Sequence, residues 1–250
     1  MSGILYLIPN TLGLMSTDCI DPLSQVIPAD VRAITADLDY FIAENAKTAR
    51  AFLKLVSSIH PLRKPLQEIK IVELNINTHA SALPELLAPI IAGTNAGLLS
   101  EAGVPAVADP GANLVRLAHT KGVVVKPLVG PSSILLAVMA SGLNGQSFAF
   151  NGYLPVDSSQ RSKRIKELES RSRQEKQTQL FIETPYRNTA LLEAIITNCQ
   201  AGTLVCIATD LTLSTETVST QTAAKWKNDC AAGRVPDFQK KPTVFLFLAE

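Results

Sequence analysis

The stretch from Leu98 to Gly111 combines a buried-strand pattern, two turns and the acidic residues Glu101 and Asp109. An apolar run opens it, turns follow around Gly103 and at Asp109–Gly111, and a helical pattern begins at Asn113. Such turns leave backbone N–H and C=O groups accessible at the carboxyl end of a strand, where open α/β sheets bind small ligands. The stretch predicts a ligand-binding loop. The alternative is an ordinary strand-to-helix connection, because glycine and proline are common in loops.

Four acidic side chains and one arginine stand in turns or at the ends of predicted strands: Glu44, Glu101, Asp109, Glu183 and Arg187. A carboxylate in such a place can accept a proton from a substrate, and an arginine can hold a phosphate or a carboxylate. Structural roles compete with these. Asp109 precedes Pro-Gly and is typical of a turn residue, and Glu183 and Arg187 are spaced for a local ion pair.

Composition indicates a globular protein with a substantial core. Of the 250 residues, 46% are hydrophobic and 18% are charged, and this balance argues against disorder. The net charge of +1 gives no electrostatic case for nucleic acid over the whole molecule, although a local basic face remains open. The sequence has no apolar run of about 18 residues and no basic segment ahead of its first strand, so we expect neither a membrane helix nor a signal peptide.

The cysteines and histidines give no metal-binding pattern. Cys19, Cys199, Cys206 and Cys230 form no CxxC pair, and the three histidines are scattered. We expect no zinc site and four reduced cysteines in a cytoplasmic protein.

Short apolar runs alternate with helical patterns, which indicates an α/β fold with a parallel sheet in at least the first half. We place a domain boundary near residue 120, giving an N-terminal α/β domain (1–120) and a C-terminal α/β domain (121–250). The predicted strands are Ile4–Ile8, Tyr40–Ala43, Gly97–Ser100, Val123–Pro127, Ser147–Phe150, Gln179–Ile182, Thr203–Ala208 and Thr243–Ala249, the last of them central. The predicted helices are Ala46–Ser57, Leu83–Ala92, Asn113–Lys121, Ser132–Ser141, Arg161–Arg173, Thr189–Asn198 and Ala223–Ala232.

The segment from Arg161 to Lys176 is locally basic, with seven Lys and Arg against three Glu. It is a candidate to follow an RNA backbone, since phosphate contacts dominate such binding. The alternative is a solvated helix face with Ile165 and Leu168 as its core contacts.

Five sequence blocks, in order, resemble the tetrapyrrole methylase family of S-adenosylmethionine-dependent methyltransferases. Within that family they are similar to the branch that methylates a cytidine ribose 2′-hydroxyl in small-subunit ribosomal RNA. The blocks are Leu5–Gly13, Ala43–Lys47, Ser100–Gly111, Pro127–Pro131 and Phe181–Arg187, with a weaker sixth at Ala208–Thr212. The resemblance implies two α/β domains, each a mixed sheet with flanking helices, with the cofactor in the inter-domain cleft and usually a homodimer.

The resemblance also implies a set of site residues. S-adenosylmethionine, with S-adenosylhomocysteine as product, is the implied cofactor, and no metal is implied. The implied catalytic residues are Glu44, Glu101, Glu183 and Arg187. The implied cofactor-binding residues are Pro9, Leu99, Ser100, Glu101, Ala102, Gly103, Val104, Pro105, Ser132, Ser133, Ile182, Glu183, Ala208, Pro242 and Thr243.

Several polar positions depart from the family pattern. Lys47 replaces an arginine, Asn45 replaces an aspartate, and Val104 brings no hydroxyl; Asn10, Thr11, Leu14, Tyr186 and Thr209 also differ. Ribosomal RNA is the favoured acceptor. A tetrapyrrole or another small molecule is the second reading, and a non-catalytic, cofactor-binding paralogue is the third.

Overall fold

The computed structural model describes residues 2–13 and 21–250, so Leu14 and Cys19 lie outside the described residues. The chain divides into two compact units, Met1–Ser132 and Ser133–Glu250. This division differs from the predicted boundary near residue 120. The reason is that strand β5 (Val124–Pro127) pairs with β1 (Ile4–Ile8), which keeps β5 in the first unit.

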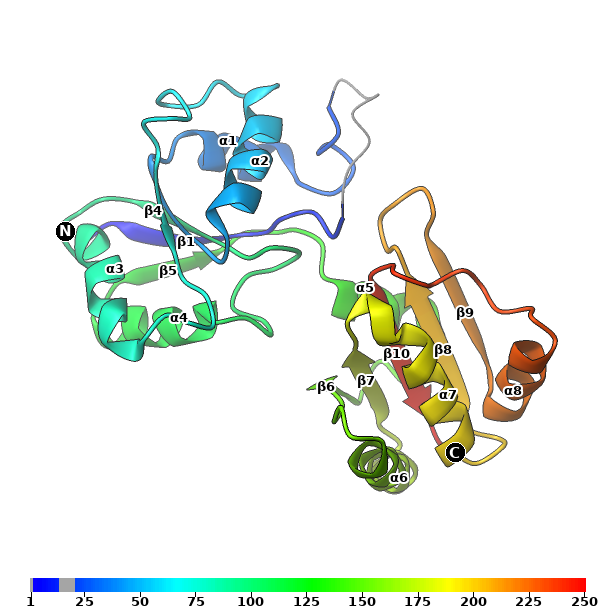
Figure 1. Ribbon diagram of the computed structural model, residues 1–250. Helices are drawn as coiled ribbons and strands as arrows, with labels where there is room; N and C mark the ends of the chain where they lie inside the picture. The colour runs from blue at the N-terminus through cyan, green and yellow to red at the C-terminus, as the bar shows by residue number, and fades with distance from the viewer. Residues whose placement is uncertain (1, 14–20) are drawn as a thin grey trace. The chain divides into compact units, whose positions relative to one another are not determined.

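The first unit is built on a five-stranded sheet in the order β3-β2-β4-β1-β5 (Figure 1). All four pairings in it are parallel, because a helical or irregular crossover separates each strand from the next. This sheet is therefore parallel, whereas the resemblance had implied a mixed sheet in each domain. Its other strands are β2 (Tyr40–Ala43), β3 (Lys70–Glu73) and β4 (Ala96–Leu99).

Helices cover the sheet of the first unit. Helix α2 (Ala46–Ser57) is amphipathic: it buries Ala49, Phe52, Leu53 and Val56 in a core shared with β1 and β2. The side chain of Asn45 caps it by accepting from the N–H groups of two residues in the first turn. The remaining helices are α1 (Ala29–Ala36), the short η1 (Ala80–Ala82), α3 (Leu83–Ile91) and α4 (Gly111–Thr120).

The second unit is built on a mixed sheet in the order β6-β7-β10-β8-β9. Strand β10 (Thr243–Leu248) lies at its centre, antiparallel to β7 (Thr178–Ile182) and β8 (Leu204–Thr209), so the predicted central strand is confirmed. The edges are β6 (Phe148–Tyr153), parallel to β7, and β9 (Thr217–Thr222), antiparallel to β8.

The two faces of β10 meet different helices. Phe245 and Phe247 lie in a core cluster with residues of α6 (Ser158–Glu175), α7 (Asn188–Asn198) and α8 (Ala223–Ala231). Val244 and Leu246 point to the opposite face by strand alternation, and α5 (Ser133–Ser141) also packs against β10. Figure 1 shows α7 in front of this sheet. A short helix, η2 (Pro185–Arg187), leads into α7.

All eight predicted strands and all seven predicted helices are present, with bounds that differ by at most three residues. The architecture of two α/β domains is thereby confirmed. Among the described residues, the elements that were missed are α1, β3, β9 and the short helices η1 and η2. Strand β6 is irregular at Gly152, which has φ +63° and lies where the register with β7 shifts.

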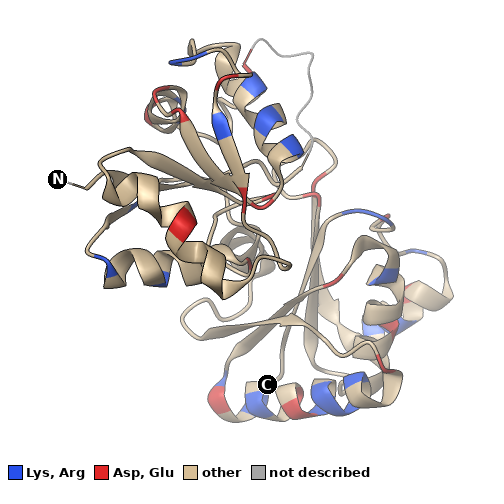
Figure 2. Ribbon diagram, turned by 60° about the vertical axis from the view of Figure 1, so that its left-hand side comes forward, with Lys and Arg blue, Asp and Glu red and all other residues tan. Residues whose placement is uncertain are grey.

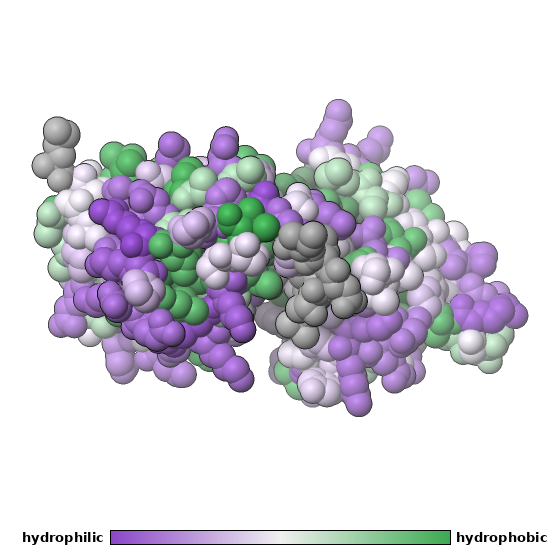
Figure 3. Space-filling view, turned by 90° about the horizontal axis from the view of Figure 1, so that it is seen from above, coloured by the Kyte–Doolittle hydropathy of each residue, from purple (hydrophilic) through white to green (hydrophobic). Residues whose placement is uncertain are grey.

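Figure 3 shows hydrophilic and hydrophobic residues intermixed on the face of each unit that is seen from above. Among the described residues, no helix is long and apolar enough to cross a membrane.

Trp226 is the largest fully buried side chain of the second unit, and its indole N–H donates to the Val205 carbonyl at 2.8 Å. We expect Trp226→Ala to lower the free energy of unfolding by about 3–5 kcal/mol, because it leaves a cavity and an unpaired carbonyl. Chemical denaturation measures this. The exposed neighbour Lys227 gives the control: Lys227→Ala should leave the midpoint nearly unchanged, and equal midpoints for the two variants would contradict the packing described.

Candidate functional site

The carboxyl ends of β1, β2 and β4 meet at one edge of the parallel sheet, since Ile8 and Ala43 both align with Leu99. The chain after these strands carries Asn10, Glu44 and Ser100. The structure therefore brings together three blocks that lie far apart in the sequence. This edge is where parallel α/β sheets bind ligands.

Asn10 joins the segment after β1 to the loop after β4. Its side-chain amide is buried and donates to the carbonyls of Ser100 (3.2 Å) and Glu101 (3.1 Å). The backbone does the same: the Asn10 N–H donates to the Gly103 carbonyl at 2.8 Å, and the Gly103 N–H donates to the Thr11 carbonyl at 3.3 Å. Asn10, which differs from the family pattern, thus fixes the predicted ligand-binding loop by hydrogen bonds.

The loop from Ser100 to Pro110 has an unusual backbone. Gly103 has φ +68°, and the non-glycine residues Ala106 and Ala108 have φ +65° and +64°, a conformation that costs L-residues free energy and occurs often at binding sites. Within the described part of the chain, the N–H groups of Ala102 and Val104 donate no hydrogen bond. The loop thus offers two free backbone donors on either side of Gly103.

Two of the predicted carboxylates adjoin this loop. Glu44 accepts from the Glu101 N–H at 3.2 Å, and Glu101 accepts from the Thr48 hydroxyl at 3.3 Å. Burial raises the pKa of Glu44 above its usual value, and the nearby carboxylates of Glu101 and Asp109 raise it further. Glu44 is half-buried, whereas Glu101 is exposed.

Asp109 has the structural role that its turn position suggested. Its carboxylate accepts from the N–H groups of Ala106 (2.8 Å) and Gly111 (2.7 Å). A Cβ at Gly111 would lie 2.7 Å from a carboxylate oxygen of Asp109, so the turn needs glycine there. Burial raises the pKa of Asp109 even though these N–H groups favour its ionised form.

The second unit has its own polar edge, where β7 and β8 end and β10 begins. Val244 aligns with Ile182 and Thr243 aligns with Thr209. The predicted residues of this unit therefore gather at one edge: Ile182, Glu183, Ala208, Pro242 and Thr243. Ser133 starts α5, and Ser132 ends the first unit.

Glu183 and Arg187 form the local ion pair that their spacing allowed. The carboxylate of Glu183 is 2% exposed and lies 2.6 Å from a terminal guanidinium nitrogen of Arg187. The same carboxylate oxygen accepts from the Thr184 N–H at 2.7 Å. Both predicted catalytic residues of this block are thus engaged with each other.

Sequence reasoning missed Asn188, Thr209 and Thr48 as parts of these edges. Asn188 is fully buried, and its amide donates to the carbonyls of Phe238 and Lys241, both at 2.9 Å, and to the Thr243 hydroxyl at 3.2 Å. The hydroxyls of Thr209 and Thr243 lie 3.2 Å apart. A polar residue at the first position of a helix was the only available signal for Asn188.

The basic helix α6 matches the solvated-face interpretation. Ile165 and Leu168 are buried in the core, and charges of both signs alternate on the rest of the helix (Figure 2). Three of its arginines pair with glutamates of the same helix: Arg164 with Glu167, Arg171 with Glu175 and Arg173 with Glu169.

Cys199, Cys206 and Cys230 are free thiols, as expected. Burial raises the pKa of each, which keeps them protonated and unreactive. The described residues contain no group of three or more His, Cys, Asp or Glu that could hold a metal ion.

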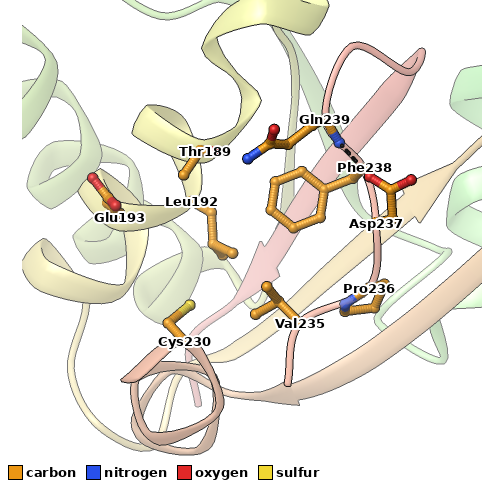
Figure 4. A pocket seen from close by; sticks show the side chains of 9 residues that line it. All are labelled: Thr189, Leu192, Glu193, Cys230, Val235, Pro236, Asp237, Phe238 and Gln239. Atoms are coloured by element: carbon orange, nitrogen blue, oxygen red, sulfur yellow. Dashed lines mark hydrogen bonds between the residues drawn. The ribbon is translucent and has the colours of Figure 1, made fainter. Parts of the chain in front are cut away.

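A cavity of about 310 Å³ lies in the second unit, between α7, α8 and the segment before β10 (Figure 4). It holds none of the predicted site residues, so it is separate from the polar edge. Its lining consists of Thr189, Leu192, Glu193, Cys230, Val235, Pro236, Asp237, Phe238 and Gln239.

Comparison with known proteins gives relatives of one kind. No family model matches the chain. The chain is 33% identical over 157 residues to "Ribosomal RNA small subunit methyltransferase I" of Vibrio cholerae, which covers 59% of this chain and 53% of that protein. It is 28% identical over 223 residues to the protein of the same name in Xylella fastidiosa, which covers 89% and 76%. The chain spans about half the length of the first curated relatives it matches.

Solved structures show the same fold. The methyltransferase CobJ matches with a TM-score of 0.62 and 16% identity, over 99% of this chain and 95% of that one. Cobalt precorrin-4 methyltransferase, CbiF, matches with a TM-score of 0.57 and 13% identity, over 98% and 94%. The fold of the chain is that of the tetrapyrrole methylases. Its sequence is similar to proteins named ribosomal RNA small subunit methyltransferase I, which supports the resemblance seen in the sequence blocks.

Removing Arg187 should expose the importance of its ion pair. We expect Arg187→Ala to lower the free energy of unfolding by about 1–3 kcal/mol, because a buried carboxylate loses its charged partner and keeps only the N–H and hydroxyl of Thr184 as donors. Denaturation of the variants measures this. The double variant Glu183→Gln with Arg187→Ala should recover part of the loss, and no recovery would contradict the role of a buried, unpaired charge.

Glu44 should make stability depend on pH. Its raised folded-state pKa means that the folded protein holds the proton more tightly than the unfolded chain, so ionised Glu44 costs stability near neutral pH and the cost vanishes as the pH falls. Because glutamine mimics the protonated form, the stability of Glu44→Gln relative to the native protein should rise from about pH 3 to about pH 7.

Asp157 supplies a control of opposite sign. Hydrogen bonds from the Gln160 N–H and the Ser159 hydroxyl lower the pKa of Asp157, so its ionised form adds stability that is lost as the pH falls. The relative stability of Asp157→Asn should therefore drop over the same rise in pH. Denaturation midpoints at several pH values test both signs, and a flat profile for Glu44→Gln would contradict the raised pKa.

Proposed function

We propose that the chain is an S-adenosylmethionine-dependent methyltransferase whose acceptor is a ribose 2′-hydroxyl of small-subunit ribosomal RNA. The observation that carries the proposal is the similarity to proteins named ribosomal RNA small subunit methyltransferase I, which extends over 223 residues. The loop after β4 supports it, since this loop lies at the edge of the parallel sheet where ligands bind. A cytoplasmic homodimer completes the proposal, from the resemblance.

The groups of the loop fit the cofactor chemically. S-adenosylmethionine carries a carboxylate, an ammonium group and ribose hydroxyls. The free N–H groups of Ala102 and Val104 can donate to the carboxylate or to the hydroxyl oxygens. The positive φ of Gly103 and the missing side chain keep the loop open to a close approach. We propose that Pro9, the run from Leu99 to Pro105, and Ser132 belong to this site.

The second unit contributes its own residues to the proposal. We propose Ser133, Ile182, Glu183, Ala208, Pro242 and Thr243 as cofactor contacts, with Arg187 placed to hold Glu183. The burial of Glu183, Ala208 and Thr243 supports this, because these positions form a dry and preorganised edge. The buried hydrogen bonds of Asn188 fix the start of β10 and so the position of Thr243.

When bound, the cofactor supplies an electrophilic methyl group, and the chain must position the acceptor and take up its proton. Glu44 and Glu101 are the carboxylates of the first unit that adjoin the loop. We propose Glu44 as the group that accepts the hydroxyl proton, because a carboxylate with a raised pKa is the stronger base. Glu101, held by the Thr48 hydroxyl, is the candidate to orient the acceptor hydroxyl by accepting its hydrogen bond.

Cofactor binding gives the direct test, and Gly103 and Gly122 give a matched pair. Both have φ +68°, but a Cβ at Gly103 would approach Leu12 and the Pro131 carbonyl, whereas nothing lies within 4 Å at Gly122. Both arginine variants therefore suffer similar backbone strain. We expect calorimetry to show micromolar S-adenosylmethionine binding that Gly103→Arg abolishes and Gly122→Arg retains.

The acceptor is tested by methyl transfer to small ribosomal subunits from cells that lack the gene for this chain. Digestion to nucleosides should reveal labelled 2′-O-methylcytidine. Cofactor binding without transfer to subunits or to a tetrapyrrole would support a non-catalytic paralogue and refute the proposal. Equal loss of binding in both arginine variants would refute the placement of the cofactor at Gly103.

A further inference from the structure

Helix α2 presents a one-signed charged face. Lys47, Arg50 and Lys54 follow a helical spacing of three and four residues and are all exposed, opposite the buried Phe52 and Val56. The helix contains no acidic residue. In Figure 2, blue segments mark the basic positions along the ribbon of the helices. We name these three side chains the α2 cation row.

The folded unit does not use this row for its own stability. Among the described residues, none of the three forms an ion pair within 4.0 Å, and the one hydrogen bond of their side chains is a 3.5 Å contact from Arg50 to the Ala46 carbonyl of the same helix. Lys47 lies in the first turn, where the helix dipole disfavours a positive charge. The Glu73 carboxylate accepts from the Ala46 N–H at the same helix end, at 3.0 Å, but forms no ion pair with Lys47 within 4.0 Å. A positive charge that opposes the helix dipole and forms no ion pair is expected where the side chain serves binding.

The contrast with α6 is one of arrangement. In α6, glutamates alternate with the basic residues and three arginines are paired within the helix, which is typical of a solvated face. In α2 the helix itself contains no acidic residue, and the carboxylates of Glu44, Glu73 and Glu101 lie only at its start. The two helices thus differ in that α6 pairs three of its arginines internally, whereas α2 pairs none of its three basic side chains within the described residues.

The α2 cation row begins at the candidate site. Thr48, in the first turn of α2, donates to the Glu101 carboxylate, and Glu44 lies two residues before the helix. Seven residues separate Lys47 from Lys54, which corresponds to about 10 Å along the helix axis. A polyanion whose reacting group reached Glu44 and Glu101 would therefore extend along the row.

We propose that Lys47, Arg50 and Lys54 bind the phosphates next to the target nucleotide and so position the RNA at the carboxylates of the site. The inference rests on the proposed function and adds the surface by which the substrate docks. Exposed ammonium and guanidinium groups are the usual partners of backbone phosphates, and such contacts fix position without reading sequence. The row would supply the local basic face that a net charge of +1 conceals.

The test compares two triple variants of equal charge. Lys47→Gln, Arg50→Gln and Lys54→Gln together neutralise the α2 cation row, and Lys163→Gln, Lys166→Gln and Arg171→Gln neutralise three exposed cations of α6. Glutamine keeps helix propensity close to that of lysine and arginine. Binding to small-subunit ribosomal RNA is measured by fluorescence anisotropy over a range of salt concentrations, and methyl transfer to small subunits is measured in parallel.

Each lost phosphate contact should reduce the slope of log K against log salt by about 0.7, so three contacts reduce it by about 2 and weaken binding about 100-fold near 0.1 M salt. We expect this for the α2 variant and little change for the α6 variant. The α2 variant should raise the KM for subunits and keep kcat and S-adenosylmethionine affinity. Unchanged RNA affinity of the α2 variant, or an equal loss in both variants, would overturn the inference. The proposed function would still stand if the native chain transferred methyl groups to small subunits. Absence of activity in the native chain would refute the function itself, and with it the inference.

Discussion

The hydrogen bonds that join the segment after β1 to the loop after β4 hold the candidate site of the first unit together. Asn10 is buried and satisfies two loop carbonyls through its side chain, while its backbone and that of Thr11 exchange hydrogen bonds with Gly103. Buried backbone groups need such partners, and the irregular loop cannot supply them itself. These hydrogen bonds hold Gly103 and its neighbours in a strained conformation. They leave the N–H groups of Ala102 and Val104 without a partner in the described residues.

The second unit solves the same problem with different residues. Its polar edge is also formed where strands end. There the Asn188 amide donates to the Thr243 hydroxyl and to two carbonyls before β10, and the hydroxyls of Thr209 and Thr243 lie within hydrogen-bond distance. Glu183 is buried with its charge matched by Arg187. In each unit a buried asparagine, Asn10 or Asn188, donates hydrogen bonds to irregular backbone at the edge of the sheet. These hydrogen bonds hold the loops in place.

The net charge of +1 conceals local clusters of positive and negative charge. Carboxylates collect at the loop of the first unit, where partial burial raises the pKa of Glu44 and Asp109. Unpaired cations lie beside them on α2, and the paired charges of α6 cancel one another. An acidic centre next to a basic row suits a polyanionic substrate with a hydroxyl that must lose a proton, because attraction acts on the phosphates and basicity acts at the reacting group.

The sequence by itself determined the α/β class, the strands and helices with apolar patterns, the central place of β10 and the turn role of Asp109. It missed α1, β3 and β9, which are short or polar and sit at the margins of the sheets, where burial leaves a weak pattern. Only the tertiary structure decided the hydrogen bonds of Asn10 to the loop, the contact of Thr48 with Glu101 and the buried hydrogen bonds of Asn188. It also decided which arginines of α6 form ion pairs. Periodicity is a local property, whereas the hydrogen bond from Asn10 to Ser100 joins residues 90 positions apart and exists only once the sheet has formed.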